Sequence, residues 1–200
     1  MSRKTGSRAA SPAPARRRKE RESTGNGAFA PNEASRALSD FEFSLIILTF
    51  GFSRWVESCM AAAAVRGLGA LDILVLHAVN HRARGRRLSE ICTLLNIDDS
   101  HLISYALKKL IAARLVQVER KGRERHYETT AEGDDACLRY REVRERFLVD
   151  SLTWMANRND ELPRSAGFLR TMTAIYDQAG RFATATSRDR PPVPPVRTKR

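Results

Sequence analysis

Cysteines are few in this chain, and their positions form no metal-binding pattern. The 200 residues include three cysteines, Cys59, Cys92 and Cys137, which lie far apart. Structural zinc sites need closely spaced pairs of cysteine or histidine, and a disulfide framework needs an even number of cysteines. The set fits a reducing cytoplasm, and we expect buried structural thiols. A thiol that senses oxidants stays open as an alternative.

Signatures of catalysis and of membrane insertion are also missing. The chain has no glycine-rich phosphate loop and no nucleophile motif with an assigned base. Its most apolar stretch, residues 41–52, contains Glu42 and stops before Arg54, short of the roughly 20 residues that cross a bilayer. No apolar segment follows the basic residues 16–19 until Phe41, so we expect no secretory signal. We therefore predict a cytoplasmic binding protein without catalytic residues, cofactor or membrane contact.

One histidine pair has a spacing that can bind metal. His77 and His81 are four residues apart in a predicted helix, which can place two imidazoles on one ion. No third ligand is evident, and apolar residues surround His77 in the sequence. We expect His77 to be a packed core or interface residue, and we predict no metal site.

Positive charge is unevenly distributed along the chain. The formal net charge is +12, of which residues 1–36 contribute +6 and residues 181–200 contribute +5. Between these ends, residues 81–126 hold eleven Lys and Arg against five Asp and Glu, whereas the other positions hold nine against fourteen. A uniformly solvated surface would not separate charge in this way. The basic segment is the candidate for contact with nucleic acid.

Both ends of the chain have the composition of flexible tails. Residues 1–35 are rich in Ser, Ala, Pro, Gly and Arg, and residues 181–200 are rich in Pro and Arg. Such segments bury too little apolar surface to fold alone. We predict two disordered basic tails around one domain at residues 36–180.

Residues 88–113 have the pattern of two short helices joined by a turn. Ser89 can cap the first helix, and Ile91, Leu94 and Leu95 share one of its faces. Asp98, Asp99 and Ser100 can cap the second, predicted over residues 99–113. The inward stripe of this second helix is predicted to be Leu102, Ile103, Ala106, Leu107, Leu110 and Ile111, opposite an outward face of His101, Ser104, Tyr105 and Lys108.

An outward helix face with donors and acceptors fits the major groove of double-stranded DNA. Any amphipathic helix has a polar face, so the segment that follows matters. Residues 115–119 alternate apolar and polar side chains, and residues 125–130 can return beside them as a β-hairpin. The basic tip, residues 120–124, contains Gly122 for the turn. Thr129 and Glu132 have capping-box spacing, so a further helix is expected near Thr130.

The helix-turn-helix and hairpin resemble the winged helix-turn-helix of the MarR family of bacterial transcription regulators. The matching pieces are residues 88–91, residues 108–116, the arginine-rich tip and residues 129–133. The tip departs from the commoner family pattern, since Lys121-Gly122-Arg123-Glu124-Arg125 replaces an aspartate-containing run before its arginine. The role of the family's wing arginine is therefore open between Arg123 and Arg125. The fold class implied is mainly α with a small β-wing and long terminal dimerisation helices.

We predict DNA contacts of two kinds. The residues that read bases are Ser100, His101, Ser104 and Tyr105. The residues that contact phosphates or the minor groove are Lys108, Lys109, Arg120, Lys121, Arg123 and Arg125, with Arg84, Arg86 and Arg87 as a further basic pool.

A homodimer is expected because the predicted terminal helices carry more apolar residues than one face can bury. Residues 36–64 form a predicted helix with apolar residues on several sides, and a stripe at Ala136, Tyr140, Val143, Phe147, Ser151 and Met155 marks another long helix. Pro163 is expected to end that region, and a last helix is predicted over residues 164–179, stopped by Gly180. An ordinary monomeric core is the alternative. The family resemblance implies dimerisation through these helices and binding to a near-palindromic operator.

The resemblance also implies a small aromatic effector that weakens DNA binding. The residues that could line its pocket are Phe52, Trp55, Cys59, His77, Tyr140 and Phe147. The alternative is that these residues are simply core. A winged-helix scaffold that binds protein rather than DNA is a further alternative, because a fold does not fix a function.

Overall fold

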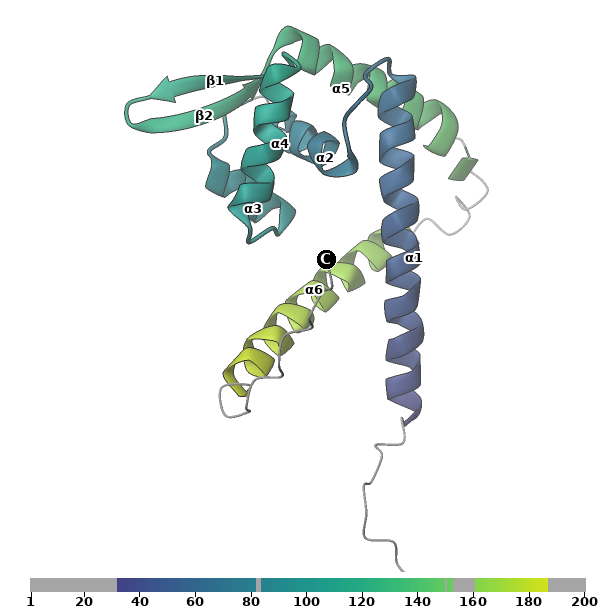
Figure 1. Cartoon of the computed structure of the whole chain (residues 1–200). Helices are drawn as coiled ribbons and strands as arrows, with labels where there is room; N and C mark the ends of the chain where they lie inside the picture. The colour runs from purple at the N-terminus through teal and green to yellow at the C-terminus, as the bar shows by residue number, and fades with distance from the viewer. Residues whose placement is uncertain (1–31, 82–83, 150, 153–160, 187–200) are drawn as a thin grey trace, which may run out of the picture. The chain divides into compact units, whose positions relative to one another are not determined.

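The computed structural model describes residues 32–81, 84–149, 151–152 and 161–186. It divides into two units, residues 1–48 and 49–200. Most of the two predicted tails lies outside the described residues. Along the described residues, four helices come first, a two-stranded wing follows, and further helices come last (Figure 1).

Helix α1 spans Glu33–Ala62 and buries few of its residues. Val56, Cys59 and Met60, all near its C-terminal end, are buried, whereas the exposed apolar residues are Leu38, Phe43, Ile46, Ile47, Leu48, Phe50 and Phe52. By length and composition alone, this 30-residue helix could cross a membrane, a test that core helices of soluble proteins also pass. Our argument that the apolar stretch at residues 41–52 is too short to cross a membrane was therefore wrong, because the helix that contains it is long enough.

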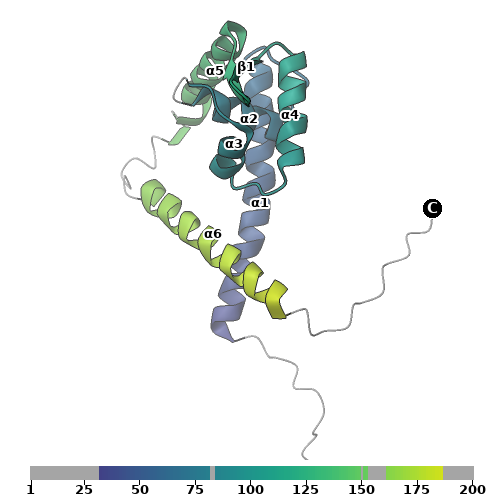
Figure 2. The same cartoon turned by 90° about the vertical axis from the view of Figure 1, so that its left-hand side faces the viewer.

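Three helices form the helix-turn-helix and its support: α2 (Ala70–Asn80), α3 (Leu88–Leu95) and α4 (Ser100–Ala112). Figure 2 shows α2 behind α3 and α4. Helix α3 is capped by Arg87 rather than by Ser89 and ends at Asn96, whose left-handed backbone (φ 52°) makes the turn. Asp99 caps α4 as predicted, since its side chain accepts a hydrogen bond from the His101 amide.

Strands β1 (Val116–Lys121) and β2 (Glu124–Thr129) form an antiparallel hairpin, the predicted wing, which projects away from the helices (Figure 1). Gly122 has φ +66° at its turn, a left-handed conformation that glycine adopts without a Cβ clash. Arg86 pairs with Tyr127 through two backbone hydrogen bonds and anchors the base of β2.

Helix α5 (Ala131–Arg144) starts beside the predicted position. Its cap is Thr130 rather than Thr129: the Thr130 hydroxyl accepts from the Gly133 amide and donates to the Arg114 carbonyl. A Cβ on Gly133 would lie 2.0 Å from the Leu115 carbonyl oxygen, so this close approach requires glycine. A π-helical turn, η1 (Glu145–Val149), follows α5; Met155 of the predicted stripe lies outside the described residues.

The last helix is longer than predicted. Helix α6 spans Glu161–Thr186 and contains both residues that we expected to bound it, Pro163 and Gly180. Pro163 is tolerated because the first turn of a helix has amides without intrahelical acceptors. Glycine lowers helix propensity by about 1 kcal/mol, which does not by itself end a helix. No residue of α6 is buried.

The core lies among α2, α3, α4, the start of β1, α5 and the end of α1. Ile73 and Leu76 of α2, Ile91 of α3 and Leu110 of α4 are fully buried in it. Of the predicted inward stripe of α4, Ile103, Ala106, Leu107 and Leu110 are buried, but Leu102 and Ile111 are 49% and 37% exposed. The inward prediction for these two was wrong because they flank the buried stripe, as does exposed Leu94 on α3.

Candidate nucleic-acid interface

The outward face of α4 carries the residues predicted to read bases. Ser100 and His101 are exposed at its N-terminal end, and Ser104 is half-buried one turn later. Tyr105 is 72% exposed. An aromatic side chain that packs in its own domain is much less exposed. Because a helix presents its N-terminal half to base edges in the major groove, these four side chains remain our predicted base readers.

The wing has two faces of different charge. In the strand register, Arg120 lies opposite Arg125, and Val118 lies opposite Tyr127 two positions closer to the base. These residues share one face because side chains alternate along a strand. Like charges directly opposite each other destabilise a hairpin unless an anion lies between them. The Arg120 and Arg125 pair is therefore suited to a phosphate.

The other face of the wing is acidic, and its one lysine is paired within the face. The Lys121 ammonium lies 2.8 Å from a Glu119 carboxylate oxygen and 3.4 Å from one of Glu128. The hydrogen bond with Glu119 raises the pKa of Lys121, and the Lys121 ammonium lowers that of Glu119. Lys121 was predicted to contact DNA, but the structure places it in this internal ion-pair group.

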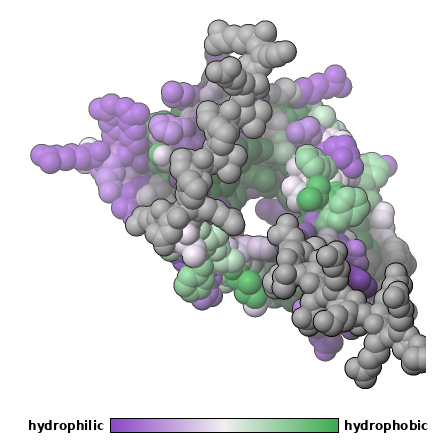
Figure 3. Space-filling model, turned by 60° about the horizontal axis from the view of Figure 1, so that its bottom comes forward, coloured by the Kyte–Doolittle hydropathy of each residue, from purple (hydrophilic) through white to green (hydrophobic). Residues whose placement is uncertain are grey.

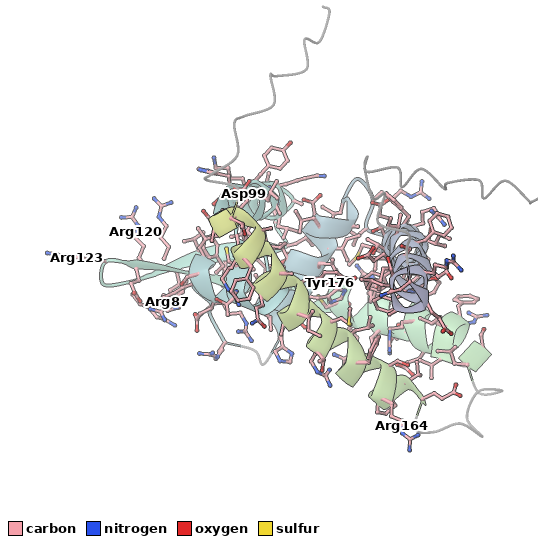
Figure 4. All side chains as sticks on the ribbon, turned by 90° about the horizontal axis from the view of Figure 1, so that it is seen from below. Arg87, Asp99, Arg120, Arg123, Arg164 and Tyr176 are labelled. Atoms are coloured by element: carbon pink, nitrogen blue, oxygen red, sulfur yellow. The ribbon has the colours of Figure 1, made fainter. Side chains whose placement is uncertain are left out.

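Four predicted contact residues have no ion pair within the described part of the chain: Lys108, Arg120, Arg123 and Arg125. Arg123 is at the wing tip, and Arg120 extends from the same ribbon away from the helices (Figure 4). The projecting wing is hydrophilic to its end, at the left of Figure 3. These cations are available to phosphates.

The arginines before α3 hold the wing in place. Arg87 pairs with Glu124 of the wing at 3.1 Å and with Glu90 of α3 at 3.6 Å, and Arg84 also reaches Glu90. A hydrogen bond from the Arg87 amide lowers the pKa of Glu90. Arg86 is 6% exposed and donates to the His81 carbonyl. Its assignment to the phosphate-binding pool was therefore wrong.

A groove lies between the wing and α4, which we call the recognition helix because its outward face carries the predicted base readers. It has a volume of about 520 Å³ and is lined by Arg87, Leu88, Ser89, Ser104, Glu124, Arg125 and Tyr127. Ser104 comes from α4 and Arg125 from β2, so one predicted base reader and one predicted phosphate contact face the same space. Sequence spacing could not show this, because it depends on how the base of the hairpin packs beside α3 and α4.

The Lys109 ammonium is paired with a carboxylate of the protein. Its ammonium lies 2.6 Å from a carboxylate oxygen of Asp72 in α2, and Asp72 is 7% exposed. The hydrogen bond with Asp72 raises the pKa of Lys109. The two residues are 37 positions apart, and the sequence carried no signal of this pairing. That Lys109 contacts phosphate stays a prediction, but its ammonium is already paired within the protein.

Three of the six predicted effector-pocket residues lie together. The Cys59 thiol donates to the Tyr140 carbonyl, and the His77 and Tyr140 rings meet edge-on with centroids 4.4 Å apart. Burial lowers the pKa of His77, and its Nε2 is buried without a hydrogen-bond partner. Trp55 packs against the core at its edge. Phe52 and Phe147 are 49% and 54% exposed, so they lie outside this buried cluster.

Two of the three cysteines are buried, as expected. Burial raises the pKa of Cys59, and it raises the pKa of Cys137 to about 12. A thiolate is the nucleophile in oxidation, so these two thiols are poorly suited to sense peroxide. Cys92 is half-buried. Within the described residues, no group of three or more His, Cys, Asp or Glu side chains is placed to hold a metal ion.

Comparison with known proteins agrees with this geometry. Residues 68–133 match the family model of the winged helix DNA-binding domain. None of the curated proteins matches the chain. The matched segment, which includes α4 and the wing, is therefore similar to winged helix DNA-binding domains.

Solved structures show the wider fold. A MarR family regulator from Neisseria meningitidis is 13% identical with a TM-score of 0.56, over 75% of this chain and 98% of that one. The transcriptional regulator BldR from Sulfolobus solfataricus is 17% identical with a TM-score of 0.53, over 74% and 99%. A MarR transcriptional regulator from Methanosarcina mazei is 13% identical with a TM-score of 0.53, over 68% and 91%. The fold of the chain is therefore similar to that of these MarR regulators, as the sequence resemblance predicts.

Proposed function

We propose that this protein is a transcription regulator that binds a near-palindromic operator as a homodimer. The observation that carries the proposal is the groove between α4 and the wing, where Ser104 and Arg125 face one space. A duplex seated there would present base edges to α4 and phosphates to the wing. This is a binding role in the cytoplasm, and the proposal involves no catalysis or cofactor.

Dimerisation is proposed from the exposed apolar residues of α1 and α6. Phe50 is 62% exposed, and on α6 Phe168 and Phe182 are 52% and 64% exposed. A second copy of the chain would cover such surfaces, and two-fold symmetry would place two recognition helices one DNA turn apart. Size-exclusion chromatography with light scattering tests this. A stable monomer at micromolar concentration contradicts the proposed dimer.

Mapping of bound genomic DNA, followed by binding to the recovered site in vitro, tests the function directly. The recovered duplex should bind more tightly than a scrambled duplex, and its affinity should fall steeply with salt. A protein-binding scaffold would show neither property. Equal, salt-independent binding to both duplexes contradicts the proposal.

Replacement of Ser104 tests base reading within the site. The Ser104→Ala variant should change base preference at the position that its hydroxyl contacts, since it removes a hydrogen-bonding group from the groove. Selection from a randomised operator library measures this. The matched control is Ser58→Ala on exposed α1, which should leave the selected sequence unchanged. An unchanged preference in both variants contradicts the assignment of Ser104.

An aromatic effector is a further part of the proposal. The supporting observation is the buried cluster of Cys59, His77 and Tyr140, in which His77 Nε2 has no partner. A phenolic ligand that enters beside Tyr140 could supply that partner. Thermal shift over a phenolic panel, paired with gel shift, tests this. If no compound alters either measurement, the effector role fails.

A further inference from the structure

The start of α2 is a meeting point of three helices. Asp72 accepts hydrogen bonds from the Gly69 amide at 2.8 Å and from the Lys109 ammonium at 2.6 Å, both on the same carboxylate oxygen. Glu57 of α1 accepts from the next amide, that of Ala70, at 2.9 Å. The backbone amides at a helix start attract carboxylates. We name these residues, Glu57, Gly69, Ala70, Asp72 and Lys109, the α2 junction.

Lys109 is the one residue of the junction that comes from the recognition helix. Its neighbour Lys108 is exposed and has no ion pair among the described residues, whereas Lys109 reaches an aspartate that is 7% exposed. An ion pair with one nearly buried partner is poorly screened by salt. Loss of the ammonium would leave the Asp72 carboxylate buried without its counter-charge, which is costly. The pair therefore fixes α4 against α2 at one point along its length.

We propose that Lys109 is a positioning residue for DNA reading, which acts through Asp72 rather than through phosphate. The inference rests on the proposed function. Its physical basis is that base readout needs α4 at a defined angle and depth in the major groove, and small displacements misalign hydrogen bonds to base edges. Lys109 sets that placement by tying α4 to α2. A phosphate contact would instead add affinity without sequence preference.

The test compares two adjacent lysines on two duplexes. Fluorescence anisotropy would measure binding to the operator recovered from genomic mapping and to a scrambled duplex, across a salt series. Lys108→Met should weaken both and reduce the slope of log affinity against log salt by about one. Lys109→Met should leave that slope unchanged and lower the operator preference by about tenfold, the loss of one misaligned base contact.

The Asp72→Asn variant separates the two mechanisms by sign. It keeps an oxygen that can accept from the Gly69 amide, but it removes a negative charge from the protein. Simple electrostatics predicts equal or tighter DNA binding, whereas positioning predicts the same lost preference as Lys109→Met. The double variant should lose no more preference than either single variant, because both remove one interaction. Lys109→Arg, which keeps the cation, should retain the wild-type preference.

Several outcomes overturn the inference. One is a Lys109→Met variant that behaves like Lys108→Met, and another is an Asp72→Asn variant that binds the operator as well as the wild type does. A third is a lower melting temperature with unchanged preference, which indicates a merely structural role. If Lys109→Met does not fold, Asp72→Asn and Lys109→Arg decide the question. If the wild type itself shows no operator preference, the proposed function fails instead.

Discussion

The winged-helix part and the terminal helices differ in how completely they bury their apolar side chains. Helix α2 buries six of its eleven residues and α4 four of thirteen, whereas α1 buries three of thirty and α6 none of twenty-six. The hydrophobic effect favours burial of apolar area. The winged-helix part therefore buries its apolar side chains within one chain, whereas the terminal helices expose apolar surface that a second chain would cover.

The first prediction tests whether the exposed apolar residues of α1 form a dimer interface. The variant Phe50→Glu places a charge on a residue that is 62% exposed, so a monomer should tolerate it while a dimer interface should not. We expect a monomer in light scattering. Specific DNA affinity should fall by about 100-fold or more, because two linked sites gain from effective concentration.

Ser58→Glu is the matched control, since Ser58 is an exposed polar position on the same helix. It should remain dimeric and bind the operator normally. A dimeric Phe50→Glu variant with wild-type affinity would remove α1 from the proposed interface.

The core of the winged-helix part gives the next largest effect. Leu107 is 1% exposed on the inward side of α4. Leu107→Ala should lower the free energy of unfolding by about 2–5 kcal/mol, since it loses buried area and leaves a cavity. Chemical denaturation measures this. Leu102→Ala is the control, because Leu102 is 49% exposed; a similar loss in both variants would contradict the difference in burial.

A wing arginine should have a smaller effect that depends on salt. Arg125→Ala removes one of the two opposed cations, Arg120 and Arg125, on one side of the wing. Affinity should fall by about tenfold for the operator and for a scrambled duplex alike, and the salt slope should decrease by about one. Lys121→Ala is the matched control, since its charge is already paired with Glu119 and Glu128. Equal losses in both variants would contradict the two-faced wing.

Most of the fold could be predicted from local patterns in the sequence. The Asp99 cap, the buried stripe at Ile103, Ala106, Leu107 and Leu110, and the hairpin turn at Gly122 were all predictable from spacing and residue type. These features depend on neighbours within a few residues, where helix and strand periodicity apply. The site residues of α4 follow directly, because an inward stripe defines an outward face.

Long-range pairings were not predictable. Lys109 and Lys108 are adjacent and chemically identical, and only the packing of α4 on α2 brings Asp72 to one of them. Arg86 appeared to be one of several loop arginines, but a backbone pairing with Tyr127 buries it. In both cases the partner is more than 35 positions away, so periodicity along one element carries no information about it. The charge of a residue therefore does not show whether that charge is already paired within the protein.

The smallest effect is expected at the cluster of Cys59, His77 and Tyr140, where the winged-helix part contacts α1. It is a change in how stability depends on pH. Burial lowers the pKa of His77 below its ordinary 6.5, so the unfolded chain takes up a proton at a higher pH than the folded chain does. Below about pH 6.5 the unfolded state binds more protons, and the free energy of unfolding falls as the pH falls. His77→Gln should reduce this slope between pH 7.5 and 5, as measured by denaturation. An unchanged slope would show that His77 stays able to protonate in the folded protein, and hence that α1 does not seal this side of the core.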